Sequence, residues 1–343
     1  MRLILLSHLS IPNQKLGANS LLSQSVLFVI FTRIFQKAYQ TMISIKQLKY
    51  ALAVGRNLHF RKAAEECNIS QSALSTALQE MEQQLGFAVF ERNNKNVLIT
   101  PLGAELLKKA QSINIQIEDI VKMKQTYGQP LSGPLSLGII PTIAPYLLPI
   151  LLPPLNDKYP KLELKIAEEQ SQTLVEHVRT GDLDCGILAL PFDCQGLLSF
   201  SFWEEDFYWV SHRDLAPPAS QPTINAQSLE SKNLMLLSEG HCLKDHALAA
   251  CKLDNNAAHS LRATSLTTLI QLVRGKLGST LVPEIGLSQL VDQSNELVKL
   301  PLSEPGPHRQ LAFIIRPNYP NLSNIESLIN VAKQSLEKSL RQK

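Results

Sequence analysis

A chain of 343 residues is long enough for two or three domains with sizeable cores. Hydrophobic residues make up 44% and charged residues 18%, a composition that excludes a disordered or fibrous protein. The net charge of +3 decides nothing about nucleic acid by itself, and five cysteines without the spacing of a secreted domain indicate a reducing cytoplasm.

Residues 1–41 differ from the rest of the chain. An apolar run at residues 21–31 is surrounded by the segment's only charged side chains, which are Arg2, Lys15, Arg33 and Lys37. The run is too short to span a bilayer and lacks the layout of a signal peptide. We interpret the segment as an extension upstream of a true start at Met42, and a targeting or membrane role is the alternative.

The apolar pattern of the next segment predicts short helices and a hairpin. A short Ala-rich helix is expected at residues 60–67. Ser70 then caps a helix that ends at Gly86 and carries a buried stripe of Leu74, Leu78, Met81 and Leu85. The polar turn at residues 92–96 is flanked by Phe90-Glu91 and by the apolar run Val97-Leu98-Ile99, which predicts a small β-hairpin. Residues 42–100 therefore predict a winged helix-turn-helix.

The helix after Ser70 is the expected recognition helix. Its short polar side chains and the nearby basic residues are suited to base edges and phosphates in a major groove. The candidate DNA contacts are Arg61, Lys62, Gln71, Ser72, Ser75, Thr76, Gln79, Arg92 and Lys95. Seven Lys and Arg residues against five Glu between residues 42 and 100 are only a slight excess, so a solvated helix surface is the alternative.

Thr100 followed by Pro101 predicts the start of a long helix over residues 101–128. Apolar residues recur along this helix at spacings of four and three, and they are Leu106, Ala110, Ile113, Ile117 and Ile120. This seam is typical of a dimerising coiled coil, although a helix lying on a domain core would also show it.

Beyond residue 129, apolar strands alternate with helical stretches, which indicates an α/β sheet with mostly parallel strands. The expected strands lie at residues 135–139, 162–166, 185–190, 208–211, 234–237, 280–282 and 311–315.

Cys242 and Cys251 form an unusual pair. The Ala and Leu residues between them predict a helix, and nine residues of helix put the second cysteine ~13 Å along the axis. A disulfide needs Cα atoms within roughly 7 Å. Linking the thiols therefore requires the helix to unwind or bend, which indicates an oxidation-driven switch. We expect the helix N-terminus and Lys244 to favour the Cys242 thiolate.

The same segment holds residue types that bind zinc, namely His241, Cys242, His246 and Cys251. Helical spacing spreads them round the axis, and no paired C-x2-C or H-x3-H unit is present. We therefore predict neither a metal site nor a cofactor.

Several separate motifs resemble the LysR family of transcriptional regulators. In the N-terminal part they are IKQL at residues 45–48, FRKAA at 60–64, SQSALS at 70–75, LG at 85–86, FER at 90–92 and TPLG at 100–103. GDLD at residues 181–184 resembles the effector domain of that family. The resemblance covers the chain from Met42 to its end. This sequence differs from the family pattern at Thr76, where many members carry a basic residue.

The resemblance implies an α/β effector domain of two Rossmann-like subdomains, similar to a periplasmic binding protein. This domain follows an N-terminal all-α winged helix-turn-helix and a long linker helix. The resulting boundaries are residues 42–100 for DNA binding, 101–128 for the linker and dimerisation helix, and 129–343 for the effector domain. Within the effector domain, subdomain I is placed at residues 132–203 plus 304–343 and subdomain II at 204–303.

Gly240-His241-Cys242, with Cys251 nine residues on, resembles the peroxide-responsive OxyR members of the family. This resemblance implies that Cys242 reacts with hydrogen peroxide and that Cys251 closes an intramolecular disulfide. The implied peroxide-binding residues are Thr142, Ser171, His241 and Arg309. A second Thr is common where Ser171 stands, and the hydroxyl is kept.

We therefore predict a cytoplasmic transcriptional activator that senses peroxide and controls antioxidant genes. The implied partners are double-stranded operator DNA, RNA polymerase and further copies of the chain in a homodimer or homotetramer, without a membrane. One alternative is a LysR-type regulator that answers to a small organic effector between the subdomains. Another is a thiol peroxidase that uses Cys242, although an enzyme has no need of a DNA-binding domain.

Overall fold

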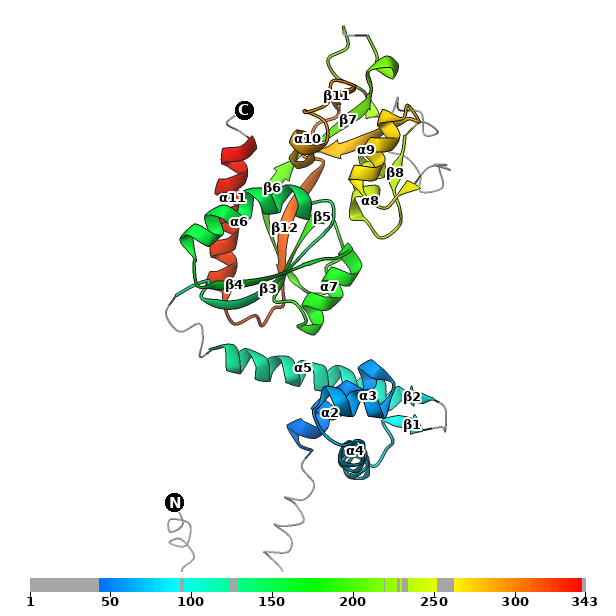
Figure 1. Ribbon diagram of the computed structural model, residues 1–343, viewed down its shortest axis with the longest axis vertical. Coiled ribbons are helices and arrows are strands. Elements are labelled where there is room, and N and C mark those ends of the chain that lie inside the picture. Colours follow the sequence, from blue (N-terminus) through cyan, green and yellow to red (C-terminus); the bar gives the residue numbers. More distant parts are fainter. Residues whose placement is uncertain are drawn as a thin grey trace, which may run out of the picture. The chain divides into compact units, whose positions relative to one another are not determined.

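The computed structural model describes residues 43–92, 96–123, 129–218, 220–226, 229, 234–251 and 262–340, with only the backbone at residues 92, 122, 123, 251 and 262. The predicted extension at residues 1–41 and the start at Met42 lie outside this part. The chain forms two compact units, Met1–Asn114 and Ile115–Lys343 (Figure 1). No helix among the described residues is long and apolar enough to cross a membrane.

The first unit confirms the predicted winged helix-turn-helix. Its elements are α2 (Ile45–Asn57), α3 (Phe60–Glu66), α4 (Gln71–Leu85), β1 (Phe90–Arg92) and β2 (Val97–Ile99). The Ser70 hydroxyl caps α4 by accepting the Ala73 N–H, and Gly86 ends α4 with a φ of 76°. The buried stripe of α4 packs into one core with the small residues Ala63 and Ala64 of α3.

Helix α5 (Pro101–Met123) begins where the Thr100 hydroxyl accepts the Gly103 N–H at 2.9 Å. The predicted seam has two parts. Leu106 packs on the core of the first unit and Ala110 is buried. Further along, Ile113 is 41% exposed and Ile120 is 65% exposed. In the later part of the seam, Ile113 and Ile120 are therefore open to solvent in a single chain and Ile117 is half-buried.

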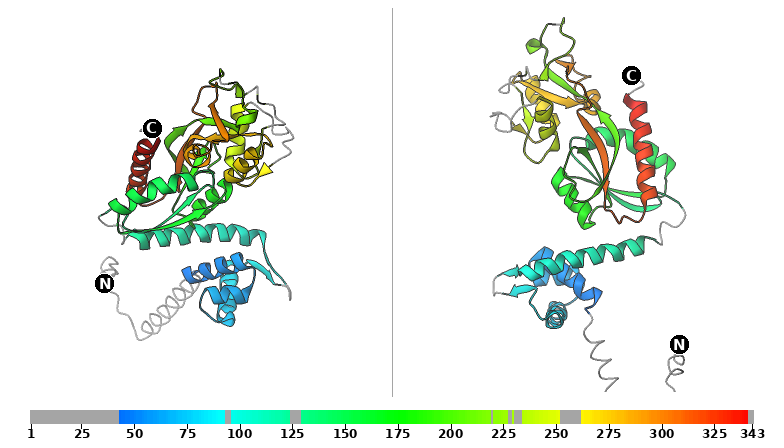
Figure 2. Two further views of the ribbon diagram at one scale, coloured as in Figure 1. Left: turned by 45° about the horizontal axis from the view of Figure 1, so that its top comes forward. Right: turned by 180° about the vertical axis from the view of Figure 1, so that it is seen from behind.

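The second unit contains a five-stranded sheet in the order β4-β3-β5-β12-β6. The strands are β3 (Gly133–Ile139), β4 (Leu162–Glu168), β5 (Cys185–Leu190), β6 (Leu198–Glu205) and β12 (Arg309–Ile315). Figure 1 and Figure 2 show two helices side by side on one face and a third on the other. The paired helices are α6 (Ala144–Lys158) and α11 (Leu322–Leu340), and the third is α7 (Ser171–Thr180).

A three-stranded sheet in the order β10-β7-β11 forms the other half of this unit. Its strands are β7 (Phe207–His212), β10 (Ser279–Pro283) and β11 (Leu297–Pro301). The surrounding elements are η1 (Arg213–Leu215), β8 (Leu236–Leu237), α8 (Cys242–Cys251), β9 (Arg262–Ala263), α9 (Leu266–Arg274) and α10 (Glu284–Leu290). The two predicted α/β subdomains are thus present.

The prediction of mostly parallel strands was wrong. Strand β3 is parallel to β4 and β5, but β12 is antiparallel to both β5 and β6, and β7 is antiparallel to β10 and β11. The cause is the connection between the sheets. The chain leaves the first sheet along β6, enters the second along β7, and returns along β12 in the opposite direction.

Candidate functional site

Three of the predicted site residues lie at helix N-termini in the second unit. Thr142 directly precedes Ile143, the N-cap of α6, and Ser171 and Cys242 are the first residues of α7 and α8. Each of the three is 2% exposed or less. The free N–H groups and the dipole at a helix N-terminus favour negative charge nearby. The positions therefore suit a site that holds an anion such as a thiolate.

Arg309, the first residue of β12, joins this group and is 1% exposed. Its Nη1 lies 3.4 Å from Thr142 Oγ1, and its Nη2 lies 3.4 Å from the Thr142 carbonyl oxygen. The positive charge of Arg309 also lowers the pKa of Cys242. The structure thus brings Ser171 and Arg309 to Cys242, and Thr142 joins the group through Arg309.

Glu205 completes the site, and the sequence did not predict it. Its carboxylate accepts Arg309 Nε at 2.7 Å and Nη2 at 2.6 Å, and its second oxygen accepts the Ile285 N–H at 2.9 Å. Arg309 and Glu205 lie opposite each other on β12 and β6, and both side chains are fully buried. A buried guanidinium needs such a partner because an unpaired buried charge costs several kcal/mol.

Burial raises the pKa of the Cys242 thiol above its ordinary value, and this is the largest effect on it. The Ser171 side chain, the Arg309 charge and the Ala189 backbone lower the pKa, whereas the Asp245 charge raises it. The Ser171 hydroxyl is buried and has no hydrogen-bond partner in the described part of the chain. It is therefore available to donate to the sulfur.

The expected influence of Lys244 on the thiol needs correction. The Lys244 ammonium pairs with the Glu239 carboxylate, and the Lys244 side chain is only 9% exposed. Lys244 is therefore occupied by a carboxylate. The net shift of the Cys242 pKa is upward despite the helix N-terminus. Removing the thiolate from water costs more free energy than the neighbouring donors contribute to its stabilisation.

The helix predicted between the two cysteines is present. Helix α8 begins at Cys242 and ends at Cys251, so the cysteines lie ~13 Å apart along the helix axis. Cys242 is a free thiol, and the Cys251 side chain lies outside the described part of the chain. A continuous helix between the two residues is incompatible with a disulfide.

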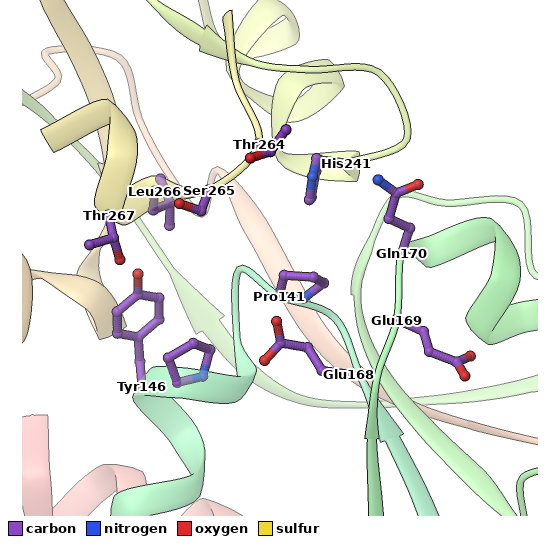
Figure 3. A pocket seen from close by; sticks show the side chains of 11 residues that line it. Pro141, Tyr146, Glu168, Glu169, Gln170, His241, Thr264, Ser265, Leu266 and Thr267 are labelled. Carbon is purple, nitrogen blue, oxygen red and sulfur yellow. The ribbon is translucent and has the colours of Figure 1, made fainter. Parts of the chain in front are cut away.

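A pocket of about 290 Å³ lies beside these segments (Figure 3). Its lining includes Pro141, Gln170 and His241, and each of these directly precedes one of the buried site residues Thr142, Ser171 and Cys242. Glu168, Glu169, Tyr146 and the start of α9 also line it. In Figure 3 the Tyr146 hydroxyl faces Thr267, and burial raises the pKa of Tyr146 to about 12.

Two histidines flank Cys242. His241 lines the pocket together with Thr264, and burial lowers the pKa of His241. His246 lies one turn into α8, is 3% exposed, and places Nε2 2.9 Å from the Pro191 carbonyl oxygen. The described residues contain no group of three His, Cys, Asp or Glu that could hold a metal ion.

Most of the candidate DNA contacts lie on the surface of the first unit. Ser75 is half-buried, and the exposed candidates are Arg61, Lys62, Gln71, Ser72, Thr76 and Gln79. Arg61 Nε lies 3.2 Å from Glu65 Oε1, an exposed pair that is easily exchanged for a phosphate contact. The side chain of Arg92 and the whole of Lys95 lie outside the described residues.

Comparisons with known proteins agree with this architecture. A model described as "Bacterial regulatory helix-turn-helix protein, lysR family" matches residues 45–104, and one described as "LysR substrate binding domain" matches residues 128–337. The chain is 37% identical over 295 residues to the HTH-type transcriptional regulator EstR of Acinetobacter baylyi, which covers 85% of this chain and 96% of the relative. It is 35% identical to a probable hydrogen peroxide-inducible genes activator of Streptomyces viridosporus, covering 85% and 94%.

Solved structures give the same result. A full-length OxyR variant of Pseudomonas aeruginosa, in which a cysteine is replaced by aspartate, is 32% identical, with a TM-score of 0.69, and the match covers 85% of this chain and 98% of that one. An H2O2-bound OxyR mutant of Corynebacterium glutamicum, in which a cysteine is replaced by serine, is 31% identical, with a TM-score of 0.60 and coverage of 88% and 94%.

Proposed function

The chain belongs to the LysR family of DNA-binding transcriptional regulators, and from this premise we propose that it activates transcription in response to hydrogen peroxide. The observation that carries the proposal is the position of Cys242. Its buried thiol lies beside Ser171 and Arg309, at the start of a helix that ends at Cys251. Relatives named as peroxide-inducible activators and OxyR structures support it.

In the proposed reaction the Cys242 thiol gives up its proton and the sulfur attacks one oxygen of hydrogen peroxide. The O–O bond breaks, and the departing oxygen leaves as water with the proton that the thiol lost. The sulfur is oxidised to a sulfenic acid while the peroxide is reduced. Arg309 and Thr142 are hydrogen-bond donors for the departing oxygen, Ser171 donates to the sulfur, and His241 binds the peroxide from the pocket side.

The second proposed step uses Cys251. Its thiol attacks the sulfenic sulfur, an S–S bond forms, and a second water molecule leaves. Because the two residues lie at opposite ends of α8, the helix must unwind before this bond can close. The rearranged segment would then change how subunits pack and so move the DNA-binding units.

The proposal includes partners that follow from the family and from exposed surfaces. We propose that α4 reads double-stranded operator DNA, that α5 joins two subunits within a dimer or tetramer, and that the activated protein contacts RNA polymerase in the cytoplasm. We also propose the domain boundaries predicted above, at residues 42–100, 101–128 and 129–343. As a regulator the protein needs to react only once per signal, which distinguishes it from a thiol peroxidase.

One observation favours a second candidate function, a regulator of a small organic effector. The pocket of about 290 Å³ is lined by several polar side chains and is large enough for a small metabolite. Such a regulator would keep its response when Cys242 is replaced by Ser, whereas the peroxide sensor would lose it.

The direct test follows the oxidation products by mass spectrometry after one equivalent of peroxide. We expect a Cys242–Cys251 disulfide in the wild type, a trapped sulfenic acid on Cys242 in Cys251→Ser, and no modification in this segment of Cys242→Ser. Sulfenic acid elsewhere, with Cys242 unmodified in the wild type, would contradict the proposal.

A further inference from the structure

His246 is a buried residue of α8 whose hydrogen bonding is incomplete. Its Nε2 lies 2.9 Å from the Pro191 carbonyl oxygen, and because a carbonyl only accepts, Nε2 carries the hydrogen. Its Nδ1 is buried and has no partner in the described part of the chain. A neutral imidazole fits this position. Protonation would place a second N–H in the interior, and no group among the described residues accepts it.

The position of His246 links it to the thiol. Cys242 and His246 are four residues apart and so lie on the same face of α8. Both residues also reach the same end of β5, because Cys242 interacts with the Ala189 backbone and His246 with that of Pro191. The bond from His246 to Pro191 therefore fastens α8 to the sheet one turn beyond the reactive cysteine.

The surroundings of His246 keep it neutral. Burial lowers its pKa and is the largest effect, while the bond to the Pro191 backbone raises the pKa. Among the charged groups, Arg309 of β12 lowers the pKa and Asp245 of α8 raises it. The net shift is downward from the ordinary histidine value of about 6.5.

We propose that His246 is a pH-sensitive positioning residue that holds α8 in its reduced packing only while the imidazole is neutral. The inference rests on the proposed function, in which α8 leaves this packing when the disulfide forms. Once α8 is released, His246 meets water and regains an ordinary pKa. Below pH ~6.5 the released state then binds a proton that the packed state does not, so acid favours the disulfide.

The test is thiol–disulfide exchange of the full chain with dithiothreitol between pH 5 and pH 8. In this reaction the protein dithiol and oxidised dithiothreitol give the protein disulfide and reduced dithiothreitol. The two thiol hydrogens lost by the protein are gained by dithiothreitol. The equilibrium constant of the exchange therefore depends on pH only if the protein takes up a further proton. For the wild type we expect the constant to move toward the protein disulfide by up to tenfold per pH unit below about 6.5.

His246→Gln is the matched variant because its amide N–H can still donate to the Pro191 carbonyl but cannot gain a proton. For His246→Gln we expect the exchange constant to lose the part of its pH dependence that the uptake of one proton causes. His59→Gln removes an exposed histidine of the first unit and should keep the full pH dependence. A purely structural role of His246 would shift the constant equally at every pH.

Equal pH dependence in the wild type and in His246→Gln, with the Cys242–Cys251 disulfide present in both, would overturn this inference and leave the proposed function intact. If peptide mapping finds no such disulfide in either protein, both proposals fail.

Discussion

At Cys242, burial and hydrogen-bond donors act on the thiol in opposite directions. Burial raises the pKa, and Ser171, Arg309 and the Ala189 backbone lower it without cancelling the effect of burial. The resting thiol is therefore protonated at neutral pH. This protects it from adventitious reaction and makes its reactivity depend on the donors around it.

The first prediction concerns Ser171. Ser171→Ala removes the donor to the sulfur, so the pKa of Cys242 should rise further and alkylation of Cys242 by iodoacetamide at pH 8 should slow by about tenfold. Ser171→Thr keeps the hydroxyl and should retain most of the rate. In the wild type the rate should rise about tenfold per pH unit from pH 7 to 9, because the thiolate is the nucleophile. Equal rates in the Ala and Thr variants would exclude this role.

The second prediction concerns the Arg309–Glu205 pair. Glu205→Gln leaves the buried Arg309 charge uncompensated and should lower the free energy of unfolding of the effector domain by about 3 kcal/mol in urea titrations. Glu204→Gln is the matched control, because Glu204 is exposed on the same strand, bonded to Gln310, and should change stability by less than about 0.5 kcal/mol. Similar losses of unfolding free energy in both variants would show that Glu205 does not stabilise the fold by compensating the Arg309 charge.

At the scale of elements, the proposed function requires α8 to exist in two conformations. Its inward side chains include Leu243, Ala247 and Leu248, which belong to the main core, and it is fastened by His246 and by the Lys244–Glu239 pair. The free energy that these contacts contribute opposes disulfide formation. Weakening the helix without touching the core should therefore favour the oxidised state.

The third prediction tests that competition. Ala249 is exposed in α8, so Ala249→Gly should weaken the helix by about 1 kcal/mol without a packing change. The exchange constant with dithiothreitol should move about fivefold toward the disulfide. Ala104→Gly makes the same chemical change at an exposed position of α5 and should leave the constant unmoved. An unaltered constant in Ala249→Gly would mean that α8 stays helical during oxidation.

Elements with local chemical signals could be predicted from the sequence, and those fixed by distant partners could not. Ser70 and Gly86 bound α4 through hydrogen bonds and backbone geometry within a few residues, and both were predicted. Strand β6 was missed because its first residues, Leu198 to Ser201, are exposed and show no buried alternation. Glu205 was missed because its partner Arg309 lies 104 residues away.

At the scale of the whole molecule, the proposed function needs a route from the thiol to the DNA-binding units, and joined subunits supply one. The open part of the α5 seam supplies a surface for this, because Ile113 and Ile120 are exposed in the single chain while Ala110 is buried. Two recognition helices joined in this way would meet successive major grooves, about 34 Å apart or a multiple of that distance.

The fourth prediction concerns this seam. Ile113→Glu combined with Ile117→Glu should place like charges in the contact between subunits and shift the chain toward monomers in sedimentation. Lys108→Glu lies on the opposite side of α5 from the seam and should assemble normally. Normal assembly of the double variant would show that the seam packs within one subunit.

The central claim is that peroxide acts through Cys242 on the DNA contacts of the protein. The most direct measurement is operator footprinting before and after peroxide, with non-reducing peptide mapping of the same samples, in the wild type and in Cys242→Ser. We predict that the wild-type footprint changes as the Cys242–Cys251 disulfide appears, and that Cys242→Ser keeps the reduced footprint throughout. An unchanged wild-type footprint, or a full response in Cys242→Ser, would contradict the account.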